Sequence, residues 1–455
     1  MLFTIGWLAT VFTDFKGSAH DSAEIAEVTT DSRVKADQSL FIPLTGENFD
    51  GHDYMKEAFN QGAIAALWDK KKKLPDFLPG DFPVFFVEDT LRALQELAQA
   101  YREKTNPVVI GVTGSNGKTT TKDLIASVVD SSFKTHKTQG NLNNQIGVPL
   151  TILSMPPDTT ALVVEMGMNH FGEIETLSHI AKPDYAVITN IGESHIEYLG
   201  SREGIAKAKL EITKGLSEDG HLIIDGDETL LRQIHQRHHV ITCGFDVSND
   251  VFIKKVKLFQ EYTQFELSDD DAYTISLLGS HHALNAAFAV TIGKLLGIAR
   301  ENVKQALTEL NLSAMRFEML NGKNGSSIIN DAYNASPTSM KASVNVVKQL
   351  EGFMQKVLVL GDMFELGEKS KTLHQTVADN IDDSVDAVFT LGDDADEITS
   401  IVKKRYPSID CRPFNSREKL SQALEEYVSN DTLILFKASR GMHFESFVKQ
   451  VIDPS

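Results

Sequence analysis

The segment from Val108 to Val129, VVIGVTGSNGKTTTKDLIASVV, constrains the fold more than any other part of the chain. An apolar run long enough for one buried strand is followed by a turn containing Gly114 and Gly117, and then by a helical pattern that starts near Lys118. A strand, a glycine-rich turn and a helix in this order are typical of parallel α/β sheets. Further buried-strand runs follow, so we predict a central parallel sheet covered by helices.

The length indicates about three domains, because 455 residues exceed what one hydrophobic core usually organises. Short strands and helices precede Asn106-Pro107, and a second doubly wound pattern begins near Met315. We therefore predict three α/β domains: a small one over residues 1–104, a central parallel-sheet domain over 105–313, and a Rossmann-like domain over 314–455. A hinge is expected at residues 312–314.

The charge and the cysteines exclude several classes of protein. Asp and Glu outnumber Lys and Arg by 63 to 44, and a net charge of −19 repels nucleic-acid phosphates, so no nucleic-acid partner is expected. Two cysteines, Cys243 and Cys411, cannot form a disulfide framework and fit a reducing cytoplasm.

The apolar amino terminus, MLFTIGWLATVF, is expected to be a packed helix and not a signal peptide. No Lys or Arg precedes Lys16, and a secretory signal needs positive charge before its apolar run. No stretch of the chain approaches 18 uninterrupted apolar residues. We expect a cytoplasmic location without membrane insertion.

The glycine-rich turn predicts a site for phosphates. Glycines let backbone N–H groups approach a phosphate chain, and the start of a helix favours negative charge. Lys118 would lie along the β and γ phosphates, and the Thr119 hydroxyl would reach Mg²⁺. The spacing departs from the strict G-x-x-x-x-G-K-[ST] pattern because Val112 holds its first position. A plain structural turn is the alternative, but the strand–loop–helix context favours binding of a nucleoside triphosphate.

Two other predicted strands end in polar residues that would meet this loop. Glu165 ends ALVVE, and His195 follows YAVITNI after a short loop. Because ligands sit beyond the carboxyl ends of parallel strands, both side chains are candidates for a metal site. Mg²⁺ prefers oxygen, so a histidine is less typical there, and a loop or core histidine is the alternative.

Lys209 falls on an apolar stripe. In REGIAKAKLEITKGL the residues Ile205, Lys209, Ile212 and Leu216 share one helical face. A buried ammonium is unfavourable unless it is paired, neutral or chemically modified. The alternative is a lysine whose stem packs while its head reaches solvent.

An asparagine cluster lies in TQGNLNNQIGVP at residues 138–149. Amides bind oxygen atoms without neutralising charge, so Asn141, Asn143 and Asn144 suit a site that holds both phosphate and substrate oxygens. An ordinary asparagine-rich turn is the alternative.

Taken together, these motifs resemble the Mur ligases. TGSNGKTTTKD, TQGNLNNQIGVP, VVEMGMNHFGEI, NIGESHIEYLGS, AKAKLEI and HHALNAAFA follow the family's order. NDAYNASPTSM, LGDMFELGEKS and ASRGMHFE resemble the member that joins D-alanyl-D-alanine to UDP-N-acetylmuramoyl-tripeptide, and TTDSR with SLFIPLTGENFDGHDY resembles its uridine-nucleotide-binding domain. The resemblance covers nearly the whole chain. It implies ATP-dependent amide-bond ligation in peptidoglycan precursor synthesis, through an acyl phosphate.

The resemblance also implies roles for individual residues. ATP would be bound by Gly114, Ser115, Asn116, Gly117, Lys118, Thr119 and Thr120 at its phosphates, by Asn285 and Asp331 at adenine and ribose, and by Arg316, Tyr333 and Asn334 in a closing strip of the third domain. Two Mg²⁺ ions would be held by Thr119, Glu165, His195 and Lys209, the last as a carbamate. We expect catalytic roles for Lys118, Glu165, His195, Lys209, Asn144 and Arg316. The UDP end of the substrate would contact Ser32 and Arg33, and Thr138 and Asn141 are further substrate-binding candidates.

Other functions remain open from sequence alone. A sister Mur ligase or folylpolyglutamate synthase would share the fold and the phosphate loop. A protein that hydrolyses nucleotide slowly and acts as a switch would share the loop, but that function gives no reason for Glu165, His195 and Lys209 to lie at one edge of the sheet. An inactive homologue would not need an intact phosphate loop. The family resemblance favours a monomer.

Overall fold

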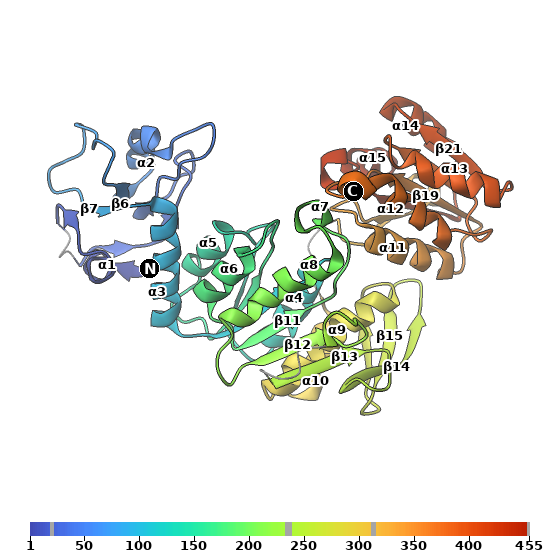
Figure 1. Ribbon diagram of the computed structural model, residues 1–455, viewed down its shortest axis with the longest axis horizontal. Helices are drawn as coiled ribbons and strands as arrows, with labels where there is room; N and C mark the ends of the chain where they lie inside the picture. The colour runs from blue at the N-terminus through green and yellow to red at the C-terminus, as the bar shows by residue number, and fades with distance from the viewer. Residues whose placement is uncertain (19–21, 233–238, 311–314, 453–455) are drawn as a thin grey trace.

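The computed structural model describes residues 1–18, 22–232, 239–310 and 315–452, which form three domains in a row (Figure 1). The amino-terminal domain, in blue, lies at one end and the carboxyl-terminal domain, in orange and red, at the other. The expected hinge at residues 312–314 lies outside the described residues. No helix in the described ranges is long and apolar enough to cross a membrane.

The first domain is a small α/β domain whose sheet has the strand order β2-β7-β6-β5-β4 and is parallel except for β2. Its strands are β2 (Phe15–Lys16), β4 (Glu27–Thr29), β5 (Ser39–Phe41), β6 (Ala63–Asp69) and β7 (Val84–Val87), and its helices are α1 (Ile5–Val11), α2 (Met55–Asn60) and α3 (Thr90–Thr105). The predicted amino-terminal helix forms as α1, where Thr4 accepts a hydrogen bond from the Trp7 amide and Ile5 and Leu8 are buried. A short strand, β1 (Phe3–Thr4), precedes it and pairs with β3 (Glu24–Ile25).

The central domain contains the long sheet with order β16-β15-β14-β13-β12-β11-β8-β10-β9. The strands are β8 (Val108–Thr113), β9 (Thr135–Lys137), β10 (Ala161–Glu165), β11 (Tyr185–Ile188), β12 (His221–Asp225), β13 (His239–Gly244), β14 (Val251–Leu258), β15 (Thr263–Leu267) and β16 (Ala272–Ile275). From β9 to β14 the pairing is parallel, as predicted. The sequence prediction missed the antiparallel β15 and β16 at the edge, where buried and half-buried residues alternate in β15 as in a sheet covered on one face.

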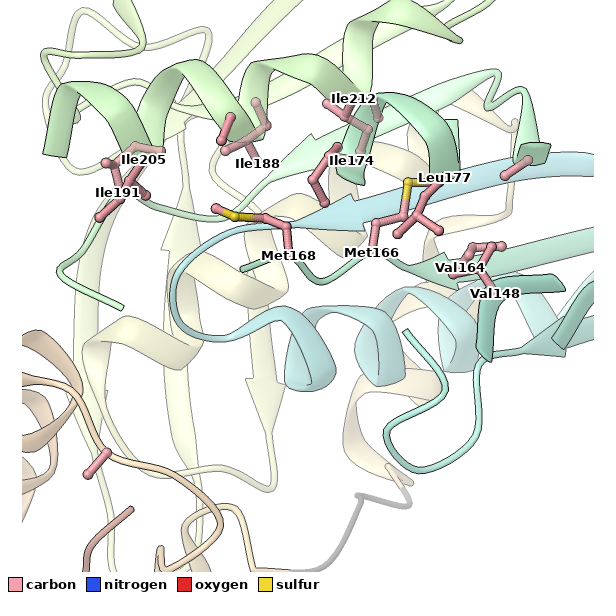
Figure 2. Packing of buried hydrophobic residues seen from close by; sticks show 14 of the residues in the cluster. Val148, Val164, Met166, Met168, Ile174, Leu177, Ile188, Ile191, Ile205 and Ile212 are labelled. Carbon is pink, nitrogen blue, oxygen red and sulfur yellow. The ribbon is translucent and has the colours of Figure 1, made fainter. Parts of the chain in front are cut away.

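Helices cover both faces of this sheet. One face packs against α4 (Lys118–Asp130), α9 (Ser280–Leu295) and α10 (Arg300–Thr308). The other packs against α5 (Gly147–Leu153), α6 (Glu173–Ala181) and α8 (Arg202–Leu210), and Figure 2 shows Ile174, Ile188 and Ile205 within this layer. Burial on both faces explains why the central strands are nearly all apolar.

The third domain repeats the doubly wound plan on a smaller scale, with strand order β17-β18-β22-β19-β20-β21. Its strands are β17 (Glu318–Asn321), β18 (Ser327–Asn330), β19 (Gln355–Gly361), β20 (Ala387–Leu391), β21 (Asp410–Phe414) and β22 (Thr432–Lys437), and only β17 is antiparallel to its neighbour. The helices are α11 (Pro337–Gln349), α12 (Ser370–Gln375), α13 (Asp396–Arg405), α14 (Arg417–Glu425) and α15 (Glu445–Val451). The alternation of these strands and helices confirms the doubly wound pattern predicted after Met315.

Helix α3 fastens the first domain to the second. The buried Tyr101 hydroxyl donates a 2.7 Å hydrogen bond to the Met155 carbonyl. Arg102 donates to the carbonyls of Ala181, at 2.9 Å, and Lys182, at 3.0 Å, just beyond α6. A guanidinium that satisfies two carbonyl groups in a buried position fixes the direction of the helix against the central domain.

We expect Arg102→Ala to destabilise the protein because it leaves these two carbonyls without their donor. The loss should be about 2 kcal/mol, which lowers the thermal midpoint by roughly 4 °C or more. Arg92→Ala is the matched control, because Arg92 lies on the same helix, its side chain is exposed, and that side chain pairs with Glu96 at 2.9 Å. Equal midpoints for the two variants in differential scanning calorimetry would show that Arg102 does not anchor the domain.

Candidate active site

The glycine-rich loop has the conformation of a phosphate cradle. It leaves the carboxyl end of β8 and enters α4 at Lys118, with Gly117 as the N-cap at φ +76° and Gly114 at φ +149°. The Lys118 ammonium folds back and donates to the carbonyl of Gly114 at 2.9 Å. The amide groups at the start of α4 and the lysine thus supply the positive potential that an anionic ligand needs.

Polar side chains beyond β11 hold the loop in place. Asn116 is bound on both sides of its peptide: its carbonyl accepts from the Thr189 hydroxyl at 2.6 Å and from the Asn190 amide at 3.0 Å, and its N–H donates to Asn190 at 3.0 Å. Gly114 permits this approach, since a Cβ there would lie 1.8 Å from Thr189 Oγ1. The loop is therefore preorganised by the neighbouring strand.

Glu165 ends β10 and is directed at the start of α4. Its carboxylate is 2% exposed and accepts two 2.8 Å hydrogen bonds, one from the Thr119 hydroxyl and one from the Asn143 amide. Its own N–H donates to Thr138 Oγ1 at 3.0 Å. Each carboxylate oxygen keeps a free lone pair, so the Thr119–Glu165 pair offers oxygen ligands of the kind that Mg²⁺ prefers.

The described residues contain no group of three or more His, Cys, Asp or Glu placed to hold a metal ion. Thr119, Glu165 and His195, which are among the residues predicted from sequence to contact a metal ion, all line one cavity.

Lys209 is buried on α8, as the apolar stripe predicts. It is 1% exposed, and Ile205 and Ile212 on either side of it lie in the buried layer of Figure 2. Burial, and then the nearby Lys118 charge, hold the pKa of the Lys209 amine well below its ordinary value. No hydrogen bond or ion pair to this amine is found among the described residues.

A cavity of about 500 Å³ joins the phosphate loop to the third domain. The predicted residues that line it are Ser115, Asn116, Gly117, Lys118, Thr119, Thr120, Glu165, His195, Asn285, Arg316, Asp331, Tyr333 and Asn334. The loop after β18 supplies the last three of these. Residues that are up to 219 positions apart in the chain, from Ser115 to Asn334, therefore meet in one cavity as the resemblance implies.

The third-domain wall of the cavity is held by charged contacts. Asp331 accepts from the Lys437 ammonium at 2.6 Å and from the Ser343 hydroxyl at 2.7 Å. The Arg316 guanidinium lies 4.1 Å from the centre of the Tyr333 ring. These contacts set the direction of a carboxylate and a guanidinium that both face the cavity.

Side-chain contacts also connect the third domain to the central domain. The Ser336 hydroxyl donates to Asn116 Oδ1 at 2.8 Å, and the Thr338 hydroxyl donates to Glu193 at 2.7 Å. His195 Nδ1 lies 2.5 Å from a carboxylate oxygen of Glu365. The third domain is therefore docked on the phosphate loop and on the loop that follows β11.

Several predicted residues lie outside the cavity lining. Asn144 is exposed and caps a turn, with its side-chain oxygen accepting from the Gly147 amide at 2.9 Å, and Asn141 is also exposed. Thr138 is fully buried beneath Glu165. In the first domain Arg33 is 87% exposed and pairs with Asp31. Ser32 beside it is half-buried. Their predicted roles remain predictions.

Asn143, one of the three asparagines singled out from sequence, contacts Glu165, while the neighbouring Asn144, which was given the catalytic role, does not; the choice within the cluster depends on the turn. Asp225 and Lys437 also line the cavity but were not singled out from sequence. Asp225 ends β12 on the same sheet edge as Glu165, so the strand-end rule could have found it. Burial raises the pKa of Asp225 to about 7. Lys437 had no local signal, because its partner Asp331 is 106 residues away.

Comparisons with known proteins agree with this arrangement. Three family models match in succession: the Mur ligase family catalytic domain over residues 24–102, the Mur ligase middle domain over 112–293, and the Mur ligase glutamate ligase domain over 315–440. The chain is 47% identical to the UDP-N-acetylmuramoyl-tripeptide–D-alanyl-D-alanine ligase of Bacillus subtilis (strain 168), covering 95% of this chain and 94% of that protein. It is 31% identical to the enzyme of the same name from Escherichia coli (strain K12), covering 96% of each.

Solved structures show the same three-domain fold. MurF from Acinetobacter baumannii superposes with a TM-score of 0.85 at 28% identity over 98% of each chain. MurF ligase from Thermotoga maritima, in complex with ADP, has a TM-score of 0.82 at 29% identity, covering 93% of this chain and 96% of that one. Folylpolyglutamate synthase from Mycobacterium tuberculosis has a TM-score of 0.60 at 16% identity over 80% of this chain and 94% of that one, a likeness of fold alone.

We expect Gly114→Ala to weaken nucleotide binding, because the new methyl group would collide with Thr189 Oγ1 and displace the loop from its anchor. Titration calorimetry with Mg²⁺ and AMPPNP, a non-hydrolysable ATP analogue, should show affinity lowered about tenfold or more, equivalent to about 1.4 kcal/mol. Gly80→Ala is the control, since a Cβ at Gly80 has no atom within 4 Å. Unchanged affinity in Gly114→Ala would refute the anchoring role of Thr189.

The raised pKa of Asp225 predicts a pH dependence of stability. Between the ordinary aspartate pKa of about 4 and the folded value of about 7, the folded protein binds one proton more than the unfolded chain, so stability should fall as pH rises and level off above pH 7. Asp225→Asn should remove this slope. Thermal midpoints at several pH values between 5 and 8 should therefore improve for Asp225→Asn relative to wild type as pH rises, whereas the exposed Asp219→Asn should run parallel to wild type.

Proposed function

Because the chain belongs to the Mur ligase family, we propose that it joins D-alanyl-D-alanine to UDP-N-acetylmuramoyl-tripeptide with the hydrolysis of ATP to ADP and phosphate. The observation that carries the proposal is the single cavity in which the phosphate loop, Glu165 and the third-domain residues Arg316 and Asp331 face one another. Relatives that match over nearly the full chain have names that state this activity. The pentapeptide product is a precursor of peptidoglycan.

The proposed reaction has two steps. An oxygen of the tripeptide's terminal carboxylate attacks the γ phosphorus, the bond to the bridging oxygen breaks, and ADP leaves. The dipeptide amine then attacks the carbonyl carbon of the acyl phosphate, loses a proton, and expels phosphate. Lys118 of the phosphate loop and Arg316 of the third domain stabilise the negative charge that spreads over the phosphoryl oxygens. No covalent enzyme intermediate is required.

Closure of the cavity protects the acyl phosphate. Phosphate is a good leaving group for water as well as for an amine, so solvent must be kept out during the second step. We propose that the third domain provides this protection, with its contacts to Asn116 and Glu193 holding it beside the phosphate loop. We propose that Asn285 and Asp331 bind adenine and ribose, with Tyr333 and Asn334 in the same wall.

We further propose that Thr119, Glu165, His195 and a carbamate on Lys209 hold Mg²⁺, which would lower the charge repulsion between ATP and the attacking carboxylate. The support for the carbamate is the burial of Lys209, the lowered pKa of its amine and its lack of a described partner. A neutral amine adds CO₂ and releases a proton, and the resulting carbamate oxygens are suited to Mg²⁺. The ordinary charged lysine would be opposed by burial and by Lys118.

The substrates are proposed to enter from different domains. Ser32 and Arg33 lie in the first domain, where a uridine diphosphate could be held, and Thr138, Asn141 and Asn144 belong to the central segment near Glu165. We propose a cytoplasmic location, since ATP and UDP-linked precursors are cytoplasmic compounds and both cysteines are free and buried. The family resemblance favours a monomer.

The test of function is phosphate release from ATP and Mg²⁺ with UDP-N-acetylmuramoyl-tripeptide and D-alanyl-D-alanine, omitting each in turn. We expect release only when all are present, together with a pentapeptide product of matching mass. Release that needs a different amino acid or a folate would assign the chain to a sister ligase or to folylpolyglutamate synthase. Release without either cosubstrate would indicate a nucleotide switch.

Lys209→Ala should reduce turnover severely, because it removes the proposed carbamate ligand and opens space for a small anion. Added formate or acetate should restore part of the rate by supplying carboxylate oxygens in that space. Lys207→Ala is the matched control on the same helix, where the side chain is exposed and lies near the Phe171 ring. Wild-type activity in Lys209→Ala, or a severe loss in both variants, would contradict the carbamate proposal.

A further inference from the structure

A carboxylate of the third domain contacts the ring of His195 in the central domain. His195 Nδ1 lies 2.5 Å from Glu365 Oε2, and the two side chains are 19% and 40% exposed. Glu365 lies in the loop after β19, within the motif LGDMFELGEKS that no part of the proposed mechanism uses. Figure 1 shows α7 (Ile196–Leu199), which follows His195, beside the carboxyl-terminal domain.

The backbone on both sides is shaped for this contact. His195 and Glu365 have φ angles of +64° and +63°, in a region that non-glycine residues rarely adopt. The Glu365 carbonyl also accepts a hydrogen bond from the Glu197 amide at 3.3 Å. Left-handed residues persist where surrounding contacts hold them, so the two loops are fitted to each other by main chain and side chain together.

The contact bears on which ring nitrogen of His195 can face a cation. A carboxylate oxygen 2.5 Å from Nδ1 favours the tautomer with its proton on Nδ1, which leaves the Nε2 lone pair for a cation. Histidine ligands of metal ions commonly donate their second ring N–H to a carboxylate, and that partner fixes the ring orientation. Glu365 is placed to do so although it does not line the cavity itself.

We propose that Glu365 is a positioning residue that orients His195 for a divalent cation, so that the metal site is completed only when the third domain is docked. The inference rests on the metal site of the proposed function. The Thr338 hydroxyl contacts Glu193, two residues before His195, so the third domain contacts the loop after β11 on both sides of His195. Domain docking and metal binding would thereby favour each other.

Other carboxylates near the ring are less suited. Glu193 is already engaged by the Thr338 hydroxyl at 2.7 Å. Glu197 lies on α7 and has an exposed side chain. Glu368, three residues after Glu365 and also exposed, has no described contact with His195 and therefore provides a matched control.

The test uses the full chain with Mn²⁺ as the probe in place of Mg²⁺, in the presence of AMPPNP. Mn²⁺ affinity is measured by electron paramagnetic resonance, and electron spin echo modulation from ¹⁴N reports an imidazole bound to the ion. We expect ¹⁴N modulation in wild type and its loss in His195→Ala. Glu365→Gln should weaken the modulation and lower Mn²⁺ affinity about tenfold, and Glu368→Gln should match wild type.

A double-mutant cycle separates orientation from a general structural effect. If Glu365 acts through His195, Glu365→Gln should cause no further loss of Mn²⁺ affinity in a His195→Ala background, while independent damage would add. Wild-type modulation and affinity in Glu365→Gln, additive losses, or no ¹⁴N modulation in wild type would each overturn the proposal. None of these readouts needs the peptide substrates, so the inference can fail while pentapeptide synthesis is confirmed, and the reverse.

Discussion

The parallel register of β8, β10 and β11 is the constraint on which the site depends. Glu165 at the end of β10 pairs with Val112, and Ile188 at the end of β11 pairs with Thr113, so the three strands finish within one residue of each other. The segments that follow these strands must therefore leave the sheet at the same edge. This backbone arrangement alone places three parts of the site together: the phosphate loop, the Glu165 carboxylate and the loop that contains His195.

The residues at this edge of the sheet also explain how an acidic protein can bind an anion. The chain has a net charge of −19, yet its central cavity has to accept a tri- or tetra-anion. Lys118, Arg316 and Lys437 line that cavity, and the start of α4 adds its amide groups. Because fields between charges fall off strongly with distance in salt solution, this local arrangement outweighs the distant surface carboxylates.

Sequence predicted most of this where the signal is local. The strand–loop–helix unit, the burial of Lys209 and the strand-end position of Glu165 follow from periodicity and topology, and the structure confirms them. The asparagine cluster was found from sequence, but which of its amides faces Glu165 depends on which one the turn uses as a cap. Glu365 and Lys437 could not be found this way, since their partners lie in distant segments.

The burial of Lys209 also limits the rate at which its amine can react. A reagent reaches an amine that is 1% exposed only when the packing around Ile205 and Ile212 opens, so both the addition and the removal of any group are limited by local opening. For the carbamate proposed at Lys209, the chemical state of the lysine would then depend on the carbon dioxide present while the chain folded. Two preparations of identical sequence would differ in their active fraction, and a short change of buffer would not equalise them.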